Sequence, residues 1–184
     1  MIVMPSLSRR IAGAVPAAVL LAALLPAAPA AALGPDDFAT GPLIDTYGPV
    51  AAVPGAAPLP PGTTFHVAFD VADRSTEDAL NSTLTGAARF LNMHVGAGVA
   101  AEDLHLAIIV HGGAVHDVTR AAAGENADLV EALLSHGVRL IVCGQSAAYQ
   151  DVTADDLLPD VEMALSAMTA HALLQADGYT LNPF

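Results

Sequence analysis

The chain has 184 residues, with 19 acidic side chains against six arginines and no lysine, and its formal net charge is −13. A surface this acidic repels nucleic-acid phosphates and anionic lipid headgroups, so both are excluded as partners. The acidity is typical of a solvated, soluble surface; attraction of a cationic partner is the alternative.

The first 32 residues have the pattern of a secretory signal peptide. Arg9 and Arg10 precede an apolar stretch over residues 11–25. Small residues at the A-x-A spacing of a cleavage site follow at Ala28, Ala30 and Ala32. We therefore expect residues 1–32 to be removed on export to the periplasm or the outside of a bacterium, with an uncleaved anchor helix as the alternative. Cleavage would leave 184 − 32 = 152 residues, enough for one domain, with a formal charge of 4 − 19 = −15 and no membrane span.

Residues 33–62 are rich in proline, with seven prolines between Gly34 and Gly62. Proline at this density is incompatible with a helix or a central strand, so an irregular arm is expected. Its first half carries four apolar side chains that would fix it to the domain: Phe38, Leu43, Ile44 and Tyr47. The regular fold is then expected over residues 63–184.

The first half of that domain predicts a strand, a helix and a second strand. Residues 65–71 alternate between apolar and polar or small side chains, as a strand does. Ser75 and Asp78 resemble a capping box that opens a helix ending at Gly96. Residues 106–110 are apolar on both faces, which indicates a buried strand of a parallel sheet.

The second half repeats this order. A helix is expected from Asn126 to Gly137, a strand over residues 138–142 and a short helical turn over residues 153–158. Pro159 is expected to begin a last, alanine-rich helix, suited to a core or to a subunit interface, before a terminal strand over residues 179–181. Alternation of strands and helices predicts a three-layer α/β fold, a parallel sheet with helices on both faces.

Two strand ends carry the candidate functional residues. Cys143, the only cysteine, follows the strand at 138–142, and His111 follows the strand at 106–110. Carboxyl ends of parallel strands lie on one edge of the sheet, where such folds bind ligands. The neighbouring residues offer open backbone amides or hydrogen-bonding side chains and are the predicted ligand-binding set: Gly112, Gly113, Gly144, Gln145 and Ser146.

A single thiol has no partner for an internal disulfide, so Cys143 is a nucleophile, a persulfide carrier, a metal ligand or a small buried hydrophobe. Stabilisation of its thiolate by the amides of residues 144–146 or by a protonated His111 would favour the first two. His111 itself has the alternative of hydrogen-bonding a loop. A metal site of His111, His116 and Cys143 matches no recognised spacing, and no P-loop or GxGxxG is present, so neither metal nor cofactor is expected.

Four stretches of the chain resemble a known family. They are residues 110–114 (VHGGA), 140–147 (LIVCGQSA), 156–159 (DLLP) and 164–169 (ALSAMT), and they resemble the exported branch of the DsrE/DsrF-like family over about residues 62–184. This resemblance implies a sheet of about five strands and assembly into trimers or hexamers. It also implies that Cys143 stands where sulfur-relay members carry a persulfide.

The function expected from the sequence is therefore a periplasmic or secreted protein that binds or transfers sulfane sulfur on Cys143, with His111 as a second catalytic candidate. Its partners would be other copies of the chain and a protein that donates or accepts sulfur. The alternative is a non-catalytic oligomeric binding module in which Cys143 is structural.

Overall fold

Five parallel strands form one sheet in the order β4-β3-β2-β1-β5. They are β1 (Phe65–Val71), β2 (Leu104–Val110), β3 (Arg139–Cys143), β4 (Glu162–Ala164) and β5 (Thr180–Asn182). The structure is a computed structural model and describes residues 33–183. The predicted signal peptide lies outside these residues. The predicted α/β fold with a parallel sheet of about five strands is confirmed.

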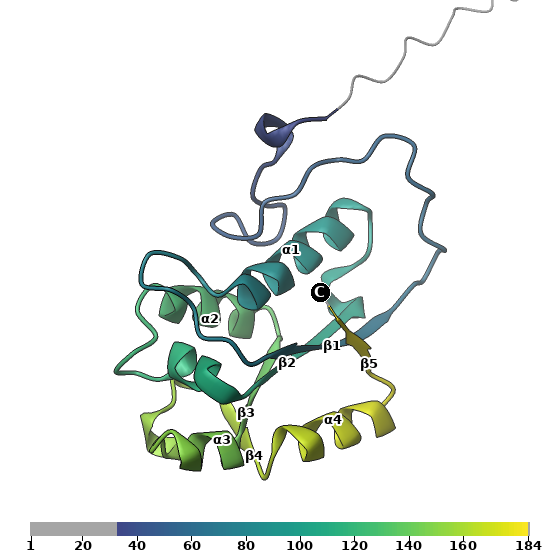
Figure 1. Cartoon of the computed structure of the whole chain (residues 1–184). Helices are drawn as coiled ribbons and strands as arrows, with labels where there is room; N and C mark the ends of the chain where they lie inside the picture. The colour runs from purple at the N-terminus through teal and green to yellow at the C-terminus, as the bar shows by residue number, and fades with distance from the viewer. Residues whose placement is uncertain (1–32, 184) are drawn as a thin grey trace, which may run out of the picture. The chain divides into compact units, whose positions relative to one another are not determined.

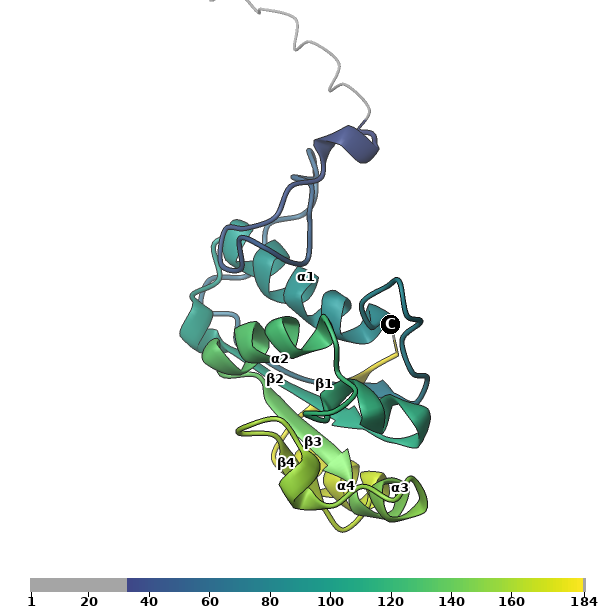
Figure 2. The ribbon, with the colours of Figure 1, turned by 90° about the vertical axis from the view of Figure 1, so that its left-hand side faces the viewer.

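Helices cover both faces of this sheet (Figures 1 and 2). The helices α1 (Ser82–Gly96) and α2 (Asn126–Ser135) lie on one face, and α4 (Ala167–Ala176) lies on the other. The short helix α3 (Gly144–Tyr149) follows β3 directly. Within residues 33–183, 3₁₀ helices lie in the arm and in the connections: η1 (Pro35–Asp37), η2 (Ala101–Asp103), η3 (Gly112–Val118) and η4 (Ala154–Asp156).

Alternation along the strands divides the core into two layers. On β2, Leu106, Ile108 and Val110 belong to the larger cluster with α1 and α2. Ala107 and Ile109 belong to the smaller cluster, which also holds Ile141 of β3 and two residues of α4. Side chains at odd-numbered positions of β2 and β3 therefore face α4, and this face includes the positions of His111 and Cys143.

The first helix begins later than the sequence predicts. Ser75 does not open it: the Ser75 amide and hydroxyl donate to the buried carboxylate of Asp117 at 2.8 and 2.9 Å, which holds this segment as a loop. The N-cap is Asn81, whose Oδ1 accepts from the Thr83 amide at 3.0 Å. Asn126 is the first residue of α2 rather than its cap, and its Oδ1 accepts from the Asn81 amide at 2.8 Å.

The last helix also differs from the prediction, which was wrong about Pro159. Glu162–Ala164 is strand β4, and α4 begins only at Ala167. The Glu162 carboxylate accepts two hydrogen bonds from Arg139 on β3, at 2.9 and 2.7 Å, and this pair favours the strand. Ser166 caps the helix, with its hydroxyl oxygen accepting from the Thr169 amide at 3.1 Å.

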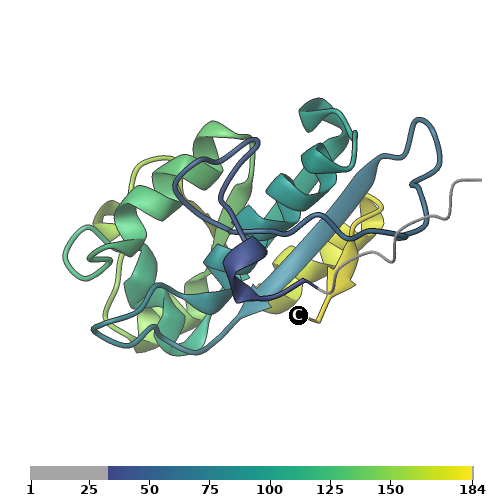
Figure 3. The same cartoon turned by 90° about the horizontal axis from the view of Figure 1, so that it is seen from above.

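The proline-rich arm is irregular and contacts α1 (Figure 3). Asn92 of α1 has no exposed surface and makes five hydrogen bonds to arm backbone. Its Oδ1 accepts from the amides of Leu43 and Ile44. Its Nδ2 donates to the carbonyls of Ile44, Tyr47 and Gly48. Ile44 is 3% exposed, so polar and apolar contacts both hold the first half of the arm.

Within residues 33–183, no helix has the length and apolar character needed to cross a lipid bilayer.

Candidate functional site

Cys143 ends β3 and is also the N-cap residue of α3. Its strand pairs with β2 on one side, through Val110 and Val142, and with β4 on the other, through Ala164 opposite Cys143. The sulfur therefore lies at the carboxyl edge of the sheet, as predicted, on the face covered by α4. Cys143 keeps 6% of its surface exposed.

Hydrogen-bond donors from two segments converge on this sulfur. The Ser146 amide donates to Sγ at 3.4 Å, and the Ser146 hydroxyl and the amides of Gln145 and Ala167 donate to it as well. Burial raises the pKa of the thiol, but these donors outweigh burial and hold that pKa below its ordinary value. The arrangement favours an ionised sulfur, which is the nucleophilic form.

The sequence predicts the amides of residues 144–146 as donors, and two of these, at Gln145 and Ser146, act on the sulfur. It does not anticipate Ala167, because the sequence pattern places the start of the last helix at Pro159. The Ser166–Thr169 cap was the signal that would have placed Ala167 at a helix start.

Two of the three glycines predicted as ligand-binding allow a close approach of neighbouring backbone. A Cβ at Gly144 would lie 2.7 Å from the Ala164 carbonyl oxygen, and one at Gly112 would lie 2.8 Å from that of Ala72. Gly112 also has a φ of +55°, and Gly113 lies near the backbone and Cβ of Arg74. Glycine is thus needed at positions 112 and 144 for close approach of neighbouring backbone, whereas a Cβ at position 113 would make ordinary contacts. Gln145 donates to the Leu165 carbonyl at 3.4 Å.

His111 follows β2, the strand next to that of Cys143, but its side chain contacts Asp70 on β1. Val110 of β2 pairs with Val142 of β3, and the next residues along the chain are His111 after Val110 and Cys143 after Val142. The Nε2 of His111 donates to Oδ2 of Asp70 at 2.9 Å, and the Nε2 of His171, on α4, donates to Oδ1 of the same carboxylate at 2.7 Å. Burial raises the pKa of Asp70, but the hydrogen bonds and charges of the two histidines outweigh burial and hold that pKa below its ordinary value.

We call Asp70, His111 and His171 the Asp70 cluster. Of these three residues, the sequence pattern identifies only His111 as a candidate. Asp70 did carry a signal, because it is the one charged residue of a strand that is otherwise apolar, small or histidine.

The three-ligand metal set considered from the sequence is not assembled. His116 contacts the Oε1 of Gln150 at 3.2 Å, away from the Asp70 cluster. Over the part of the chain that the structure describes, no three histidine, cysteine, aspartate or glutamate side chains are arranged to hold a metal ion.

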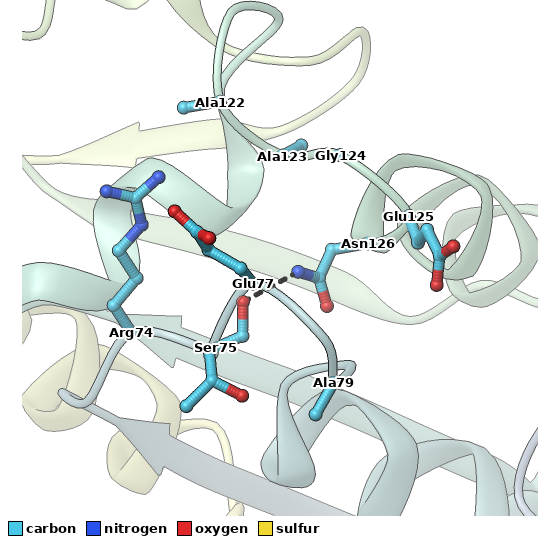
Figure 4. Close-up of a pocket in the computed structure, with 10 residues that line it drawn as sticks. Arg74, Ser75, Glu77, Ala79, Ala122, Ala123, Gly124, Glu125 and Asn126 are labelled. Carbon is cyan, nitrogen blue, oxygen red and sulfur yellow. Dashed lines mark hydrogen bonds between the residues drawn. The ribbon is translucent and has the colours of Figure 1, made fainter.

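A separate cavity of about 380 Å³ lies between the loop before α1 and the start of α2 (Figure 4). Its residues include Arg74, Ser75, Glu77, Glu125 and Asn126, but neither Cys143 nor the Asp70 cluster. The Nδ2 of Asn126 donates to the Ser75 hydroxyl at 3.0 Å, as the dashed line in Figure 4 marks. The polar groups beneath the cavity therefore satisfy one another and hold the loop in place.

Large apolar side chains are exposed around the carboxyl edge and along α4. The exposed fractions are 73% for Leu165, 79% for Met168 and 62% for Leu173. Met163 on β4 and Tyr149 on α3 are exposed as well. We call Leu165, Met168 and Leu173 the α4 apolar patch.

Comparison with known proteins identifies relatives of this fold. The family model described as DsrE/DsrF-like family matches residues 66–183. Among solved structures, the chain is similar to MTH1491, a protein of unknown function from Methanobacterium thermoautotrophicum, with 20% identity and a TM-score of 0.52 over 65% of this chain and 99% of that one. At that identity the likeness concerns the fold. No curated protein matches the chain.

Proposed function

The chain belongs to the DsrE/DsrF-like family, and from this we propose that it carries sulfane sulfur as a persulfide on Cys143. The family suggests a role related to sulfur relay. The observation that supports Cys143 as the carrier is the convergence of Ser146, Gln145 and Ala167 donors on its sulfur, with a thiol pKa below the ordinary value.

These donors suit each stage of such chemistry. Only the thiolate attacks a sulfane sulfur, and the donors increase the fraction of thiolate at neutral pH. With thiosulfate, the thiolate takes the outer sulfur, the S–S bond of thiosulfate breaks, and sulfite leaves with the bonding electron pair. The persulfide formed on Cys143 is again an anion that can accept hydrogen bonds.

We further propose that the protein acts in the periplasm or outside the cell as a homo-oligomer. The sequence pattern of residues 1–32 supports export. The α4 apolar patch supports association of copies, because large apolar side chains that are this exposed are typical of interaction surfaces. A protein that donates or accepts sulfur would then meet Cys143 near this patch.

A second function is favoured by one observation. Only 6% of Cys143 is exposed, which suits a structural cysteine in a non-catalytic oligomeric binding module. Thiol labelling of the native protein separates the two functions. A carrier reacts without denaturant, whereas a structural cysteine reacts only after unfolding.

The deciding experiment measures intact mass after incubation with thiosulfate or polysulfide. We expect the wild-type protein to gain the mass of one or more sulfur atoms, and a reductant to remove that gain. The Cys143→Ser variant is the matched control, because it keeps a side chain of similar size and should gain nothing. Equal gain in this variant, or none in the wild type, contradicts the proposal.

A further inference from the structure

The Asp70 cluster joins three segments at the carboxyl edge of the sheet. Asp70 comes from β1, His111 follows β2, and His171 comes from the middle of α4. The two Nε2 atoms lie 2.9 and 2.7 Å from separate oxygens of one carboxylate. A carboxylate that fixes an imidazole through one ring nitrogen leaves the other nitrogen directed elsewhere, which is how proton-transferring histidines are commonly held.

The cluster is partly exposed, and its His111 follows β2, the strand next to that of Cys143. The side chains of His111, His171 and Asp70 are 30%, 20% and 38% exposed. Within residues 33–183, the Nδ1 of His111 has no hydrogen-bond partner, while its Nε2 is committed to Asp70. His111 and Cys143 occupy the next register position after the pair Val110–Val142, and both face α4. A reactant at Cys143 would therefore lie at the same edge of the sheet as His111, one strand away.

Resting on the persulfide function of Cys143, we propose that His111 is a catalytic acid that selects thiol persulfides as sulfur donors, and that Asp70 and His171 position it. The leaving group of such a donor is a thiolate, whose conjugate thiol has an ordinary pKa near 8.5, so it gains from a proton as it departs. Sulfite, the leaving group from thiosulfate, is stable as an anion and has less need of an acid.

The Cys143 thiolate attacks the outer sulfur of a small-molecule persulfide, R–S–SH, and forms Cys143–S–SH. The donor S–S bond breaks, and the R–S group leaves with the electron pair. Protonated His111 gives its Nδ1 proton to that group, so R–SH leaves and His111 is neutral. Water then returns a proton to the imidazole. No net oxidation or reduction occurs.

His171 has the second positioning role. It lies four residues after Ala167 on α4, and the Ala167 amide donates to the Cys143 sulfur. The contact between His171 and Asp70 therefore ties together the helix that serves the thiol and the carboxylate that holds His111.

The test compares two donors on one set of variants. The rate of sulfur loading on Cys143 is measured by mass spectrometry with glutathione persulfide and, separately, with thiosulfate. For His111→Gln we expect about a 100-fold loss with the persulfide, the lower range for removal of a general acid, and less than a threefold change with thiosulfate. Asp70→Asn should give the same selective loss at about tenfold. His105→Gln, a histidine on the same face at the amino end of β2, should leave both rates unchanged.

The outcomes separate this proposal from the one on which it rests. If the wild type loads no sulfur from either donor, the function of Cys143 fails. If the wild type loads sulfur but His111→Gln and Asp70→Asn lower the loading rate equally with both donors, or with neither donor, the acid role is overturned. The carrier role of Cys143 then survives. Equal slowing indicates a purely structural cluster. Should His111→Gln fail to fold by circular dichroism, the donor ratio of Asp70→Asn decides.

Discussion

The Nε2 of His171 lies 2.7 Å from Oδ1 of Asp70, although 101 positions of the chain separate the two residues. This contact joins α4 to β1 across the smaller layer of the core, and His111 approaches the other oxygen of the same carboxylate. One carboxylate thus fixes the relative positions of three segments at the edge where Cys143 lies.

Acid should weaken the fold in part through Asp70. Because the pKa of Asp70 is lower in the folded chain than its ordinary value of 3.8, the unfolded chain binds more protons near that pH. The contribution of Asp70 to stability is therefore present above about pH 4 and is lost as the pH falls through the lowered pKa. We expect Asp70→Asn to reduce the decrease in Tm between pH 5 and pH 3, measured by circular dichroism. The pKa values of Asp156 and Glu162 are also lowered, so these two residues should preserve part of the dependence of Tm on pH in the variant. Identical slopes in variant and wild type would contradict this.

Removing the Ser146 hydroxyl should make the thiol less acidic. That hydroxyl donates to the Cys143 sulfur, so Ser146→Ala should raise the thiol pKa towards its ordinary value. At pH 7 we expect iodoacetamide to react about 2- to 10-fold more slowly, since one hydrogen bond contributes about 0.5 to 1.5 kcal/mol. The measurement is the alkylation rate as a function of pH. Ser135→Ala, remote on α2, is the control, and a profile unchanged by Ser146→Ala would show that the hydroxyl does not act on the sulfur.

Gly144 should not tolerate a side chain. A Cβ there would lie 2.7 Å from the Ala164 carbonyl oxygen, so Gly144→Ala must displace β4 from β3. We expect a loss of about 1 to 3 kcal/mol in the free energy of unfolding, measured with urea. Gly86→Ala is the matched control, because it lies in α1 with open space around its Cβ position and should stabilise the helix by about 0.5 to 1 kcal/mol. Equal effects of the two substitutions would rule out the close approach.

Asn92 should hold the arm on the domain. Its side chain makes five hydrogen bonds to arm backbone in a fully buried position, and Asn92→Ala would remove all five. We expect a loss of about 2 to 4 kcal/mol and faster proteolytic cleavage within residues 39–62. Limited proteolysis followed by mass spectrometry locates the cuts. Gln175→Ala, at an exposed position of α4, should leave the pattern unchanged; protection equal to wild type in the Asn92 variant would disprove this role.

The proposed oligomer should depend on the α4 apolar patch. Met168 is 79% exposed, and a charge there would have to be buried in any interface formed by this face. We expect Met168→Glu to shift the protein towards monomers in analytical ultracentrifugation by at least tenfold in dissociation constant. Met93→Glu, on α1 across the sheet, is the control for the added charge. An unaltered assembly in the Met168 variant would place the interface elsewhere.

The sequence predicts the strands best where burial alone decides them. Residues 106–110 are apolar throughout, residues 138–142 are apolar except for Arg139, and both segments lie within or overlap observed strands. The prediction from sequence fails at residues 75 and 159–166, where contacts distant in the chain determine the secondary structure. Asp117 holds Ser75 in a loop, and Arg139 stabilises Glu162 in a strand. Local helix signals at these positions are outweighed by contacts across the sheet or between distant loops.

The same limit applies to the site. The position of Cys143 at a strand end follows from the pattern of one segment, whereas the Asp70 cluster depends on strand order and on where α4 begins. His111 can be assigned to the correct edge from sequence, but its partner on β1 cannot, because the neighbour of each strand is a property of the whole sheet.

Both outer strands of the sheet, β4 and β5, are only three residues long. An edge this short exposes few free backbone groups to a strand from another molecule, which is a common protection against amyloid-like growth and aggregation. The proposed association of copies would then depend on helical surfaces and not on extension of the sheet.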